Sequence, residues 1–382
     1  MMQTCDIMRE STRHGDDLHD RDAVLELLTD FRISPVLEGK ISLARKDIWA
    51  SRQLRPARSL FSYDHRSGTI LQNRRYVQDV TRSEQGWIAD TARCGTSALR
   101  AAHLLDQLAP QGLSFHADMR DRRIGPSRLS PKGKIIPVFQ HNRPVGTHGA
   151  ILWPLLPHYH EPGSLTFFGG ATCDTMPFQT KEPRIFWRGS LNGRDAQDRH
   201  PITLARDLQA GRVDRDTCLE HMMTVPRFAL VRRFQDHPLC DFGLVDTASR
   251  LWSRIYGLRR SGRIQRAETC RYRYQLVVEG NDWASNFPWL CETNCLILRQ
   301  EMAWQAFYDG LFRPWEHFVP IARDFSDLED KYAWCEANLD KCQQIIATAQ
   351  TTARLIAAPG FIEASNNRVI ARYRAFTKGL EM

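Results

Sequence analysis

The sequence of 382 residues contains 42% hydrophobic and 25% charged residues, the balance of a folded globular protein. It has no run of the roughly 18 consecutive apolar residues that a membrane helix needs. The first thirty residues carry too many charges for a secretory signal, so the chain as written is expected to be cytoplasmic. The length favours two domains over one or three.

The net charge is +8, and arginines gather between Arg250 and Arg273 and again between Arg45 and Arg75. Basic patches of this kind attract phosphates on nucleotides, nucleic acids or anionic membranes. The alternative is a solvated surface balanced by the 44 acidic residues. The sequence contains no zinc-finger spacing and no RNA-binding aromatic motif, which argues against a nucleic-acid-binding protein.

The first half is expected to form an α/β domain over residues 21–165, after a polar and disordered N-terminus of residues 1–20. A run of apolar residues at helical spacing ends at Pro110, and short apolar runs follow it. The predicted elements are helices at 22–31 and 85–108 and strands at 113–117, 135–139 and 151–155.

Residues 157–183 are rich in Pro, Gly and Thr, which places the boundary between the domains in this stretch. The second half, residues 166–350, is expected to form another α/β domain. A capping box at Ser326 predicts one long helix to about residue 357. In the remaining segment, 351–382, a basic helix at 367–377 is expected, and it could return to the first domain. The predicted strands are 184–187, 274–278 and 294–298.

The strand Tyr274–Val278 is followed at once by Glu279-Gly280-Asn281, a break that predicts a sharp loop. In open α/β sheets, ligands bind where loops leave the carboxyl ends of the strands. A helix beginning near Asp282 or Ser285 would offer unpaired N–H groups to a diphosphate. The alternative is an ordinary strand–helix–strand connection without a ligand.

Metal and cofactor motifs are scarce in this sequence. The ten cysteines include no C-x-x-C pair, which predicts reduced, buried thiols, with Cys291 and Cys295 packed in the core. His158 and His160 would share one face of a strand, but no third ligand accompanies them, so we predict no metal site. G-x-G-x-x-G and P-loop motifs are also absent, which argues against a dinucleotide enzyme and a P-loop NTPase.

Four segments, in the same order, resemble glycosyltransferase family 90. They are Arg120-Asp121, the block 186–190 with Arg199 after it, the stretch 271–287, and the block 313–320 followed by 324–328. The resemblance covers roughly residues 110–350. It implies a GT-B-like α/β fold, with two Rossmann-like domains facing across a cleft and helices at the C-terminus. It also implies a metal-independent transferase that needs no cofactor and takes a UDP-sugar as co-substrate.

The resemblance assigns chemical roles to the first two segments. Asp121 matches the general base, which takes the proton of the acceptor hydroxyl. Arg188, Gly189, Ser190 and Arg199 match the block that contacts the diphosphate, where positive charge stabilises the leaving group. The alternatives are an Asp121 paired with neighbouring arginines in a turn, with Asp118 as the base, and an Arg199 on the surface near Asp195 and Asp198.

The loop at 280–287 matches the part of the family that holds the base, ribose and phosphates, through Gly280, Trp283, Ser285 and Asn286. Trp283 could instead belong to the core. Eukaryotic members of the family often carry arginine where this chain has Asn286. Either Arg271, Arg273 or another residue must then compensate for the missing charge, or the affinity for the donor is lower. His317, in the 313–320 block, is predicted to be structural.

These residues predict an inverting transfer of a hexose or pentose, glucose or xylose, from a UDP-sugar to an acceptor hydroxyl. The acceptor would be a glycan, a lipid-linked precursor or a protein, and a lipopolysaccharide or capsule precursor is favoured. Peripheral association with the inner membrane face would follow from the basic runs. The alternatives are a catalytically degenerate member acting as a binding or scaffold protein, and a basic nucleic-acid-binding protein.

Overall fold

The computed structural model describes residues 20–37, 40–44, 60–72, 80–84, 86–89, 96–119, 134–147, 149–155, 160, 162–164, 167–170, 174–245 and 249–380. The chain divides into two compact units. Unit 1 comprises residues 1–164, 304–311 and 356–382, and unit 2 comprises residues 165–303 and 312–355. The predictions for the N-terminal tail, Asp121 and His158 lie outside the described residues.

Unit 1 contains a mixed sheet in the order β2-β1-β5-β6-β8. Its antiparallel half is β1 (Phe61–Asp64) with β2 (Thr69–Gln72), and β1 also runs antiparallel to β5. Its parallel half is β5 (Phe115–Ala117), β6 (Val138–Gln140) and β8 (Ala150–Leu152). The three strands predicted in this half are therefore confirmed, with shorter bounds than the sequence suggested.

The remaining elements of unit 1 are three helices, two small antiparallel strand pairs and two 3-10 turns within the part of the chain that the structure describes. They are α2 (Arg21–Leu37), α5 (Thr96–Leu108), α14 (Phe361–Thr377), β3 (Val80–Ser83) with β4 (Gly86–Ala89), β7 (Asn142–Pro144) with β13 (Trp304–Ala306), and the turns Ala109–Gln111 and Asp309–Leu311.

The helix predicted at 85–108 is wrong over its first turns. Residues 86–89 form strand β4, which pairs with β3, and the helix begins only at Thr96. Gly86 has φ 120, a conformation that a helix cannot contain and that glycine adopts readily. The backbone at Gly86 therefore prevents a helix at the start of β4, although apolar residues at helical spacing extend into this strand.

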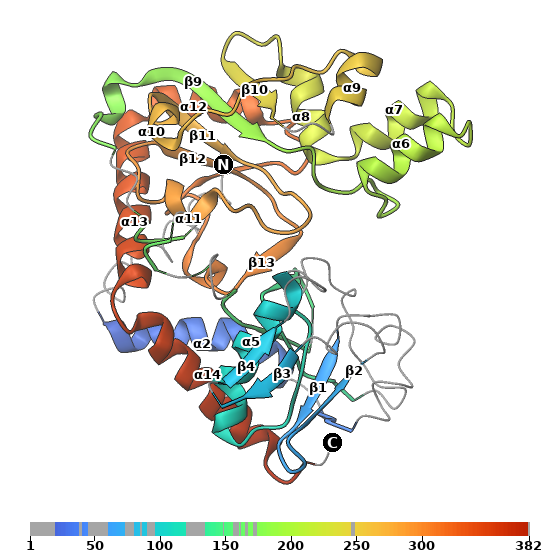
Figure 1. Cartoon of the computed structure of the whole chain (residues 1–382). Helices are drawn as coiled ribbons and strands as arrows, with labels where there is room; N and C mark the ends of the chain where they lie inside the picture. Colours follow the sequence, from blue (N-terminus) through green and yellow to red (C-terminus); the bar gives the residue numbers. More distant parts are fainter. Residues whose placement is uncertain are drawn as a thin grey trace. The chain divides into compact units, whose positions relative to one another are not determined.

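A buried arginine joins three elements of unit 1. The side chain of Arg32 on α2 donates hydrogen bonds to Leu152 O at 2.9 Å, to Ser365 Oγ at 2.6 Å and to Asn366 Oδ1 at 2.7 Å. Burial lowers the pKa of Arg32 to about 9. Since α2 and α14 lie side by side (Figure 1), these bonds fix the C-terminal helix to the sheet through Leu152 of β8.

Unit 2 contains a sheet of five strands that all run parallel, in the order β10-β9-β11-β12-β14. The strands are β9 (Glu182–Gly189), β10 (Cys240–Leu244), β11 (Tyr272–Val277), β12 (Leu296–Gln300) and β14 (Val319–Ile321). Numbered by their place in the chain, this order is 2-1-3-4-5. Such a sheet has its topological switch point between the first and third strands, here β9 and β11.

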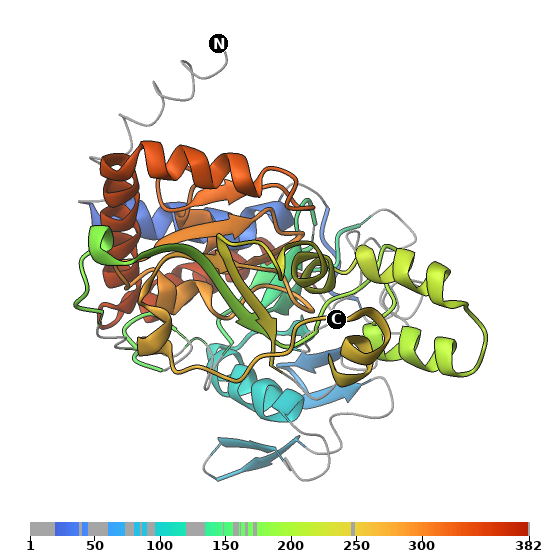
Figure 2. The same cartoon turned by 90° about the horizontal axis from the view of Figure 1, so that it is seen from above.

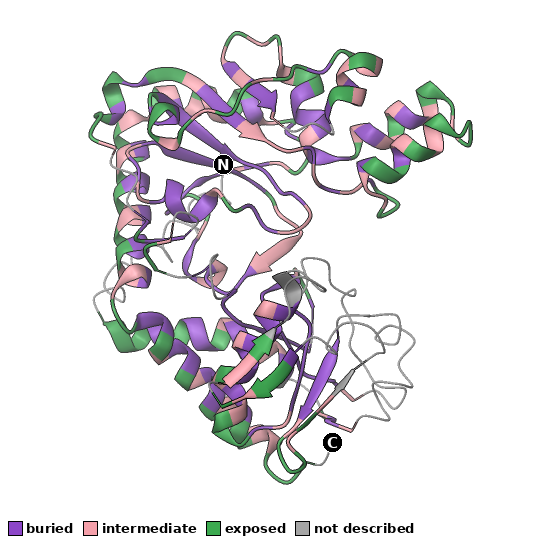
Figure 3. Ribbon diagram, viewed as in Figure 1, coloured by how far each residue is buried: buried purple, intermediate pink, exposed green. Residues whose placement is uncertain are grey.

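Helices surround this sheet, and both β11 and β12 are buried along their lengths (Figure 3). One face of the strands packs Trp187, Phe242, Tyr274 and Leu298 into a core that the helices complete. No described helix is long and apolar enough to cross a membrane. The helices are α6 (Pro201–Gln209), α7 (Arg215–Met223), α8 (Pro226–Phe234), α9 (Ser249–Tyr256), α10 (Arg266–Thr269), α11 (Phe287–Leu290), α12 (Leu328–Ala337) and α13 (Leu339–Ala357), with a 3-10 turn at Phe178–Thr180.

The single long helix predicted from Ser326 is wrong, because the structure has two helices there. Asn338 separates them with φ −136 and ψ 46, and its side chain donates to Trp334 O at 2.8 Å. An asparagine side chain that bonds to the backbone competes with the helix in this way. The capping box is not formed either, since α12 begins at Leu328, after Asp327.

His317 lies inside unit 2 and is structural, as the sequence predicts. Its Nδ1 accepts a hydrogen bond from Arg313 N at 3.1 Å, and its Nε2 lies 3.1 Å from Thr352 Oγ1 on α13. Burial lowers the pKa of His317 to about 4. The unfolded chain therefore binds a proton at this residue more readily than the folded one, and stability falls as the pH drops below about 6.5.

Replacing His317 with Gln is expected to remove this pH dependence while leaving an acceptor for Arg313 N. Between pH 7.5 and 4.5, the wild type should lose about 2 to 3 kcal/mol more unfolding free energy than the variant. Urea unfolding at the two pH values measures the difference. His237→Gln, at a partly exposed histidine, is the control. Equal losses in the wild type and the His317 variant would contradict this role for the buried imidazole.

Candidate active site

Two loops leave the sheet of unit 2 at its switch point, and we call them the switch-point loops. One comprises residues 190–194 after β9, and the other comprises residues 279–286 after β11. Because β9 and β11 are paired in parallel, both loops start from the same edge of the sheet. Gly193 N donates to Asn281 Oδ1 at 3.3 Å, and a Cβ on Gly193 would lie 3.4 Å from Gly280 O. The two loops therefore touch.

Arg227, near the start of α8, binds both switch-point loops. Its guanidinium donates to Ser190 O at 2.9 Å, to Glu279 O at 3.0 Å and to Val278 O at 3.2 Å. A Cβ on Gly280 would lie 2.8 Å from Nη2 of Arg227, so only glycine lets the guanidinium lie in this place. The same side chain stacks over the ring of Trp187, 5.6 Å from its centroid.

Sequence reasoning missed Arg227, because it lies between the four motif segments on which the resemblance was based. One signal was available. Pro226 is the first residue of α8, so Arg227 is the second, where the positive end of the helix dipole disfavours a cation. An arginine at the second residue of a helix indicates that its side chain has partners elsewhere in the fold.

Gly189 and Ser190 begin the first loop as predicted, and Gly189 has a packing reason. A Cβ on Gly189 would lie 2.5 Å from Cζ2 of Trp187, whose ring covers this residue. Gly189 and Arg227 therefore both contact the indole of Trp187. A side chain at residue 189 would therefore displace the Trp187 ring at the end of β9.

Glu279 ties together the ends of three strands. Its side chain is 7% exposed, pairs with Arg323 at 3.0 Å and accepts a hydrogen bond from Ala303 N. Its backbone N–H donates to the side chain of Gln300 at 3.1 Å. These contacts join the segments that follow β11, β12 and β14, so the second loop starts from a fixed point.

Arg188 and Arg199 each lie against a carboxylate. Arg188 forms an ion pair with Asp241, whose other oxygen accepts a hydrogen bond from the Tyr272 hydroxyl. Burial alone would raise the pKa of Asp241, but the bonds from Tyr272 and Arg188 outweigh it and hold that pKa below its ordinary value. Arg199 pairs with the buried carboxylate of Asp195 at 2.7 Å.

The structure does not bring Arg271 or Arg273 to the switch-point loops. Arg271 precedes β11, at the opposite end of the strand from Gly280. The six extended residues of β11 alone separate these two ends by about 20 Å. It lies 3.5 Å from Glu182 and donates to the Tyr272 hydroxyl at 2.6 Å. Arg273 pairs with Glu336 of α12 at 2.9 Å.

The helix expected to begin near Asp282 or Ser285 begins only at Phe287 and has four residues. A helix this short has almost no dipole, so the main-chain geometry of the loop matters more than a helix terminus. Asn286 donates to Leu276 O at 3.2 Å, which holds the loop against its own strand. Ser285 is exposed, and Trp283 is 7% exposed and buried in the core.

Comparison with known proteins identifies this part of the chain. Residues 171–356, which include both switch-point loops, match the family model described as glycosyl transferase family 90. These residues belong to glycosyltransferase family 90. The resemblance stated from the sequence is thereby confirmed.

Two curated relatives show the extent of the similarity. Protein O-glucosyltransferase 3 of Rattus norvegicus is 34% identical over 103 residues, which are 27% of this chain and 20% of that protein. The O-glucosyltransferase LpsA of Dichelobacter nodosus is 28% identical over 190 residues, which are 49% of this chain and 48% of that protein. The matches thus span about half the length of these relatives or less.

The family 90 segment also contains one group of described residues whose donor atoms are close enough for a metal ion. Asp174, Cys270 and Cys295 have these atoms within 4.8 Å of one another, at the amino ends of β11 and β12. The ammonium of Lys181 bonds to both oxygens of Asp174 at 2.8 Å and also to Cys270 O. The Lys181 ammonium thus already binds the Asp174 carboxylate. A positive charge in this position does not suit a metal site.

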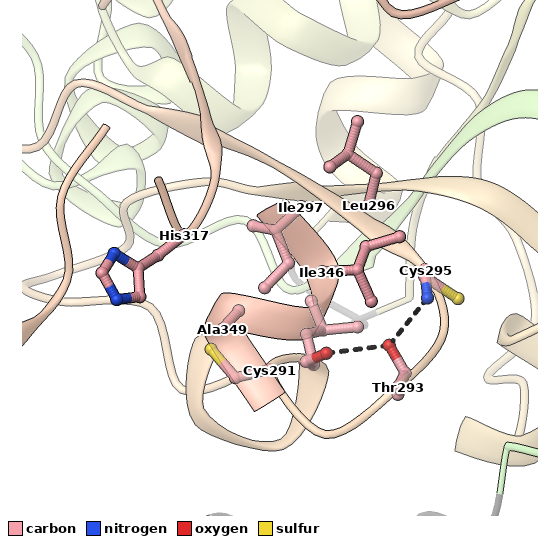
Figure 4. Close-up of a pocket in the computed structure, with 9 residues that line it drawn as sticks. Cys291, Thr293, Cys295, Leu296, Ile297, His317, Ile346 and Ala349 are labelled. Carbon is pink, nitrogen blue, oxygen red and sulfur yellow. Dashed lines mark hydrogen bonds between the residues drawn. The ribbon is translucent and has the colours of Figure 1, made fainter. Parts of the chain in front are cut away.

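A small hollow lies near the same end of the sheet (Figure 4). Its lining includes Cys291, Ile297, His317 and Ile346, and it has no room for a water molecule. At its edge, the Thr293 hydroxyl donates a hydrogen bond to Leu290 O at 2.8 Å and accepts one from Cys295 N at 3.3 Å. The prediction that Cys291 packs in the core is confirmed, and the hollow is a packing feature.

Replacing Lys181 with Met is expected to destabilise the protein strongly, because the side chains of Lys181 and Asp174 are 0% and 2% exposed. Removing one partner leaves a buried charge uncompensated, which costs about 3 to 5 kcal/mol. Urea unfolding measures the loss. Lys331→Met removes a partly exposed pair with Asp327 at 3.6 Å, and it should cost less than about 1 kcal/mol. Equal losses would contradict the structural role of Lys181.

Proposed function

We propose that the protein is an inverting glycosyltransferase that moves a hexose or pentose, glucose or xylose, from a UDP-sugar to an acceptor hydroxyl. One observation supports this most. Two segments of the family 90 match, far apart in the sequence, meet at the switch point of an all-parallel sheet. Doubly wound sheets bind nucleotides at this place.

The switch-point loops suit a nucleotide diphosphate. Arg227 brings a guanidinium to the point where the loops meet, and Gly280 leaves the space that this guanidinium occupies. Sugar transfer requires that the leaving diphosphate be stabilised as the anomeric carbon is attacked. We propose that these loops carry out that part of the reaction without a metal ion.

We propose Asp121 as the general base. Strand β5 ends at Ala117, and Asp118 directly after it is 2% exposed, with its N–H bonded to Phe139 O at 2.9 Å. A carboxylate this deeply buried cannot meet an acceptor hydroxyl, which favours Asp121 over Asp118. The assignment rests on the Arg120-Asp121 resemblance, since Asp121 lies outside the described residues.

The acceptor is proposed from the relative LpsA and from the surface charge. LpsA is named as an O-glucosyltransferase, and we propose a lipopolysaccharide or capsule precursor as the acceptor here. Arg250 and Arg254 on α9 are exposed, as is Arg263 further along the chain. Exposed cations of this kind favour peripheral association with an anionic membrane from the cytoplasmic side.

Release of UDP from UDP-glucose and UDP-xylose tests the proposal directly. The wild type should release UDP, and Asp121→Asn should reduce the rate at least about a hundredfold, since a general base contributes that much or more. Asp236→Asn, at an exposed aspartate paired with Arg259, should leave the rate unchanged.

Equal rates for the wild type and the Asp121 variant would remove Asp121 from its role. Excess EDTA should not change the wild-type rate, and a loss of turnover under EDTA would contradict the metal-free mechanism. UDP binding without any turnover would favour a second function, a catalytically degenerate binding protein. Asn286, in place of the arginine that eukaryotic members of the family often carry, is the observation that motivates this second candidate.

A further inference from the structure

We propose that Arg227 binds the diphosphate of the nucleotide sugar and supplies the positive charge that Asn286 does not. This inference rests on the proposed function, and it assigns a residue that lies outside the four motif segments. Arg227 would act as a binding residue, because its guanidinium would touch the leaving group.

Position is the first argument. The three hydrogen bonds of Arg227 reach the end of β11 through Val278 and Glu279 and the end of β9 through Ser190. These are the two strand ends that flank the switch point, where a nucleotide is expected. The side chain is half-buried, so it still faces solvent in part.

Preorganisation is the second argument. A guanidinium held by main-chain carbonyls has already lost its side-chain freedom when the protein folds, so a ligand need not order it. A fixed cation that need not reorient stabilises a developing negative charge better than a mobile one. Gly280 supports this placement, because any side chain there would push Nη2 of Arg227 away.

The orientation of the other arginines is the third argument. Arg188 turns toward Asp241, Arg194 toward Asp198 and Arg199 toward Asp195, while Arg323 pairs with the buried Glu279. Arg271 and Arg273 lie toward the amino end of β11. Arg227 is the arginine whose described hydrogen bonds lie on both switch-point loops.

Isothermal titration with UDP and with uridine tests the inference. For Arg227→Gln, the affinity for UDP should fall about ten- to a hundredfold, the usual effect of losing a charged hydrogen bond. The affinity for uridine should change less than about twofold, because uridine has no phosphate. Arg227→Lys keeps the charge and should recover part of the UDP affinity. Arg232→Gln, an exposed arginine of the same helix, is the control.

Gly280→Ala provides an independent variant, because it keeps Arg227 but displaces its guanidinium, and it should also weaken UDP more than uridine. If UDP and uridine weaken by the same factor in Arg227→Gln, with Lys no better than Gln, Arg227 is only a structural clamp and the inference is wrong. If the wild type binds no UDP, the proposed function itself fails, and this inference fails with it. Melting temperatures of all variants identify any that do not fold.

Discussion

The contact between one guanidinium and three main-chain carbonyls organises the carboxyl edge of the sheet in unit 2. Arg227 reaches Val278, Glu279 and Ser190, and so joins the ends of two neighbouring parallel strands. Several local choices follow from this contact. Gly280 leaves space for the guanidinium, and Gly189 leaves space for the indole on which it stacks. Carbonyl groups that end a buried strand need a donor, and here a side chain supplies it.

The two ends of the same sheet have different properties. At the amino end, the buried Lys181–Asp174 pair and the thiols of Cys270 and Cys295 fill the space with satisfied groups, and burial raises the pKa of Cys295 well above its ordinary value. At the carboxyl end, two loops with one glycine each, Gly193 and Gly280, lie beside the partly exposed Arg227. Beyond these loops, α6 and α7 lie side by side (Figure 1 and Figure 2). A ligand site is therefore expected at the carboxyl end only.

The sequence predicted the strands β5, β6, β8, β9, β11 and β12, because short runs of β-branched and apolar residues such as Gln275–Val278 are typical of buried strands. It did not give bounds for the largely buried strands β1, β10 and β14. It failed where a single residue overrides a periodic pattern, as at Gly86 before α5 and at Asn338 between α12 and α13. Arg227 could not be predicted as part of the site, since its partners are backbone carbonyls, which no side-chain motif records. The switch point itself depends on strand order, which a sequence does not state. The predicted GT-B arrangement and the role of Asp121 stay predictions that rest on the family resemblance.

Amide hydrogen exchange with and without UDP tests the central claim that a nucleotide diphosphate binds between the switch-point loops. The account predicts slower exchange in residues 190–194 and 278–286, with little change in residues 291–296 at the amino end of β12. Slower exchange at that amino end, or no change anywhere in residues 174–355 at saturating UDP, would contradict it.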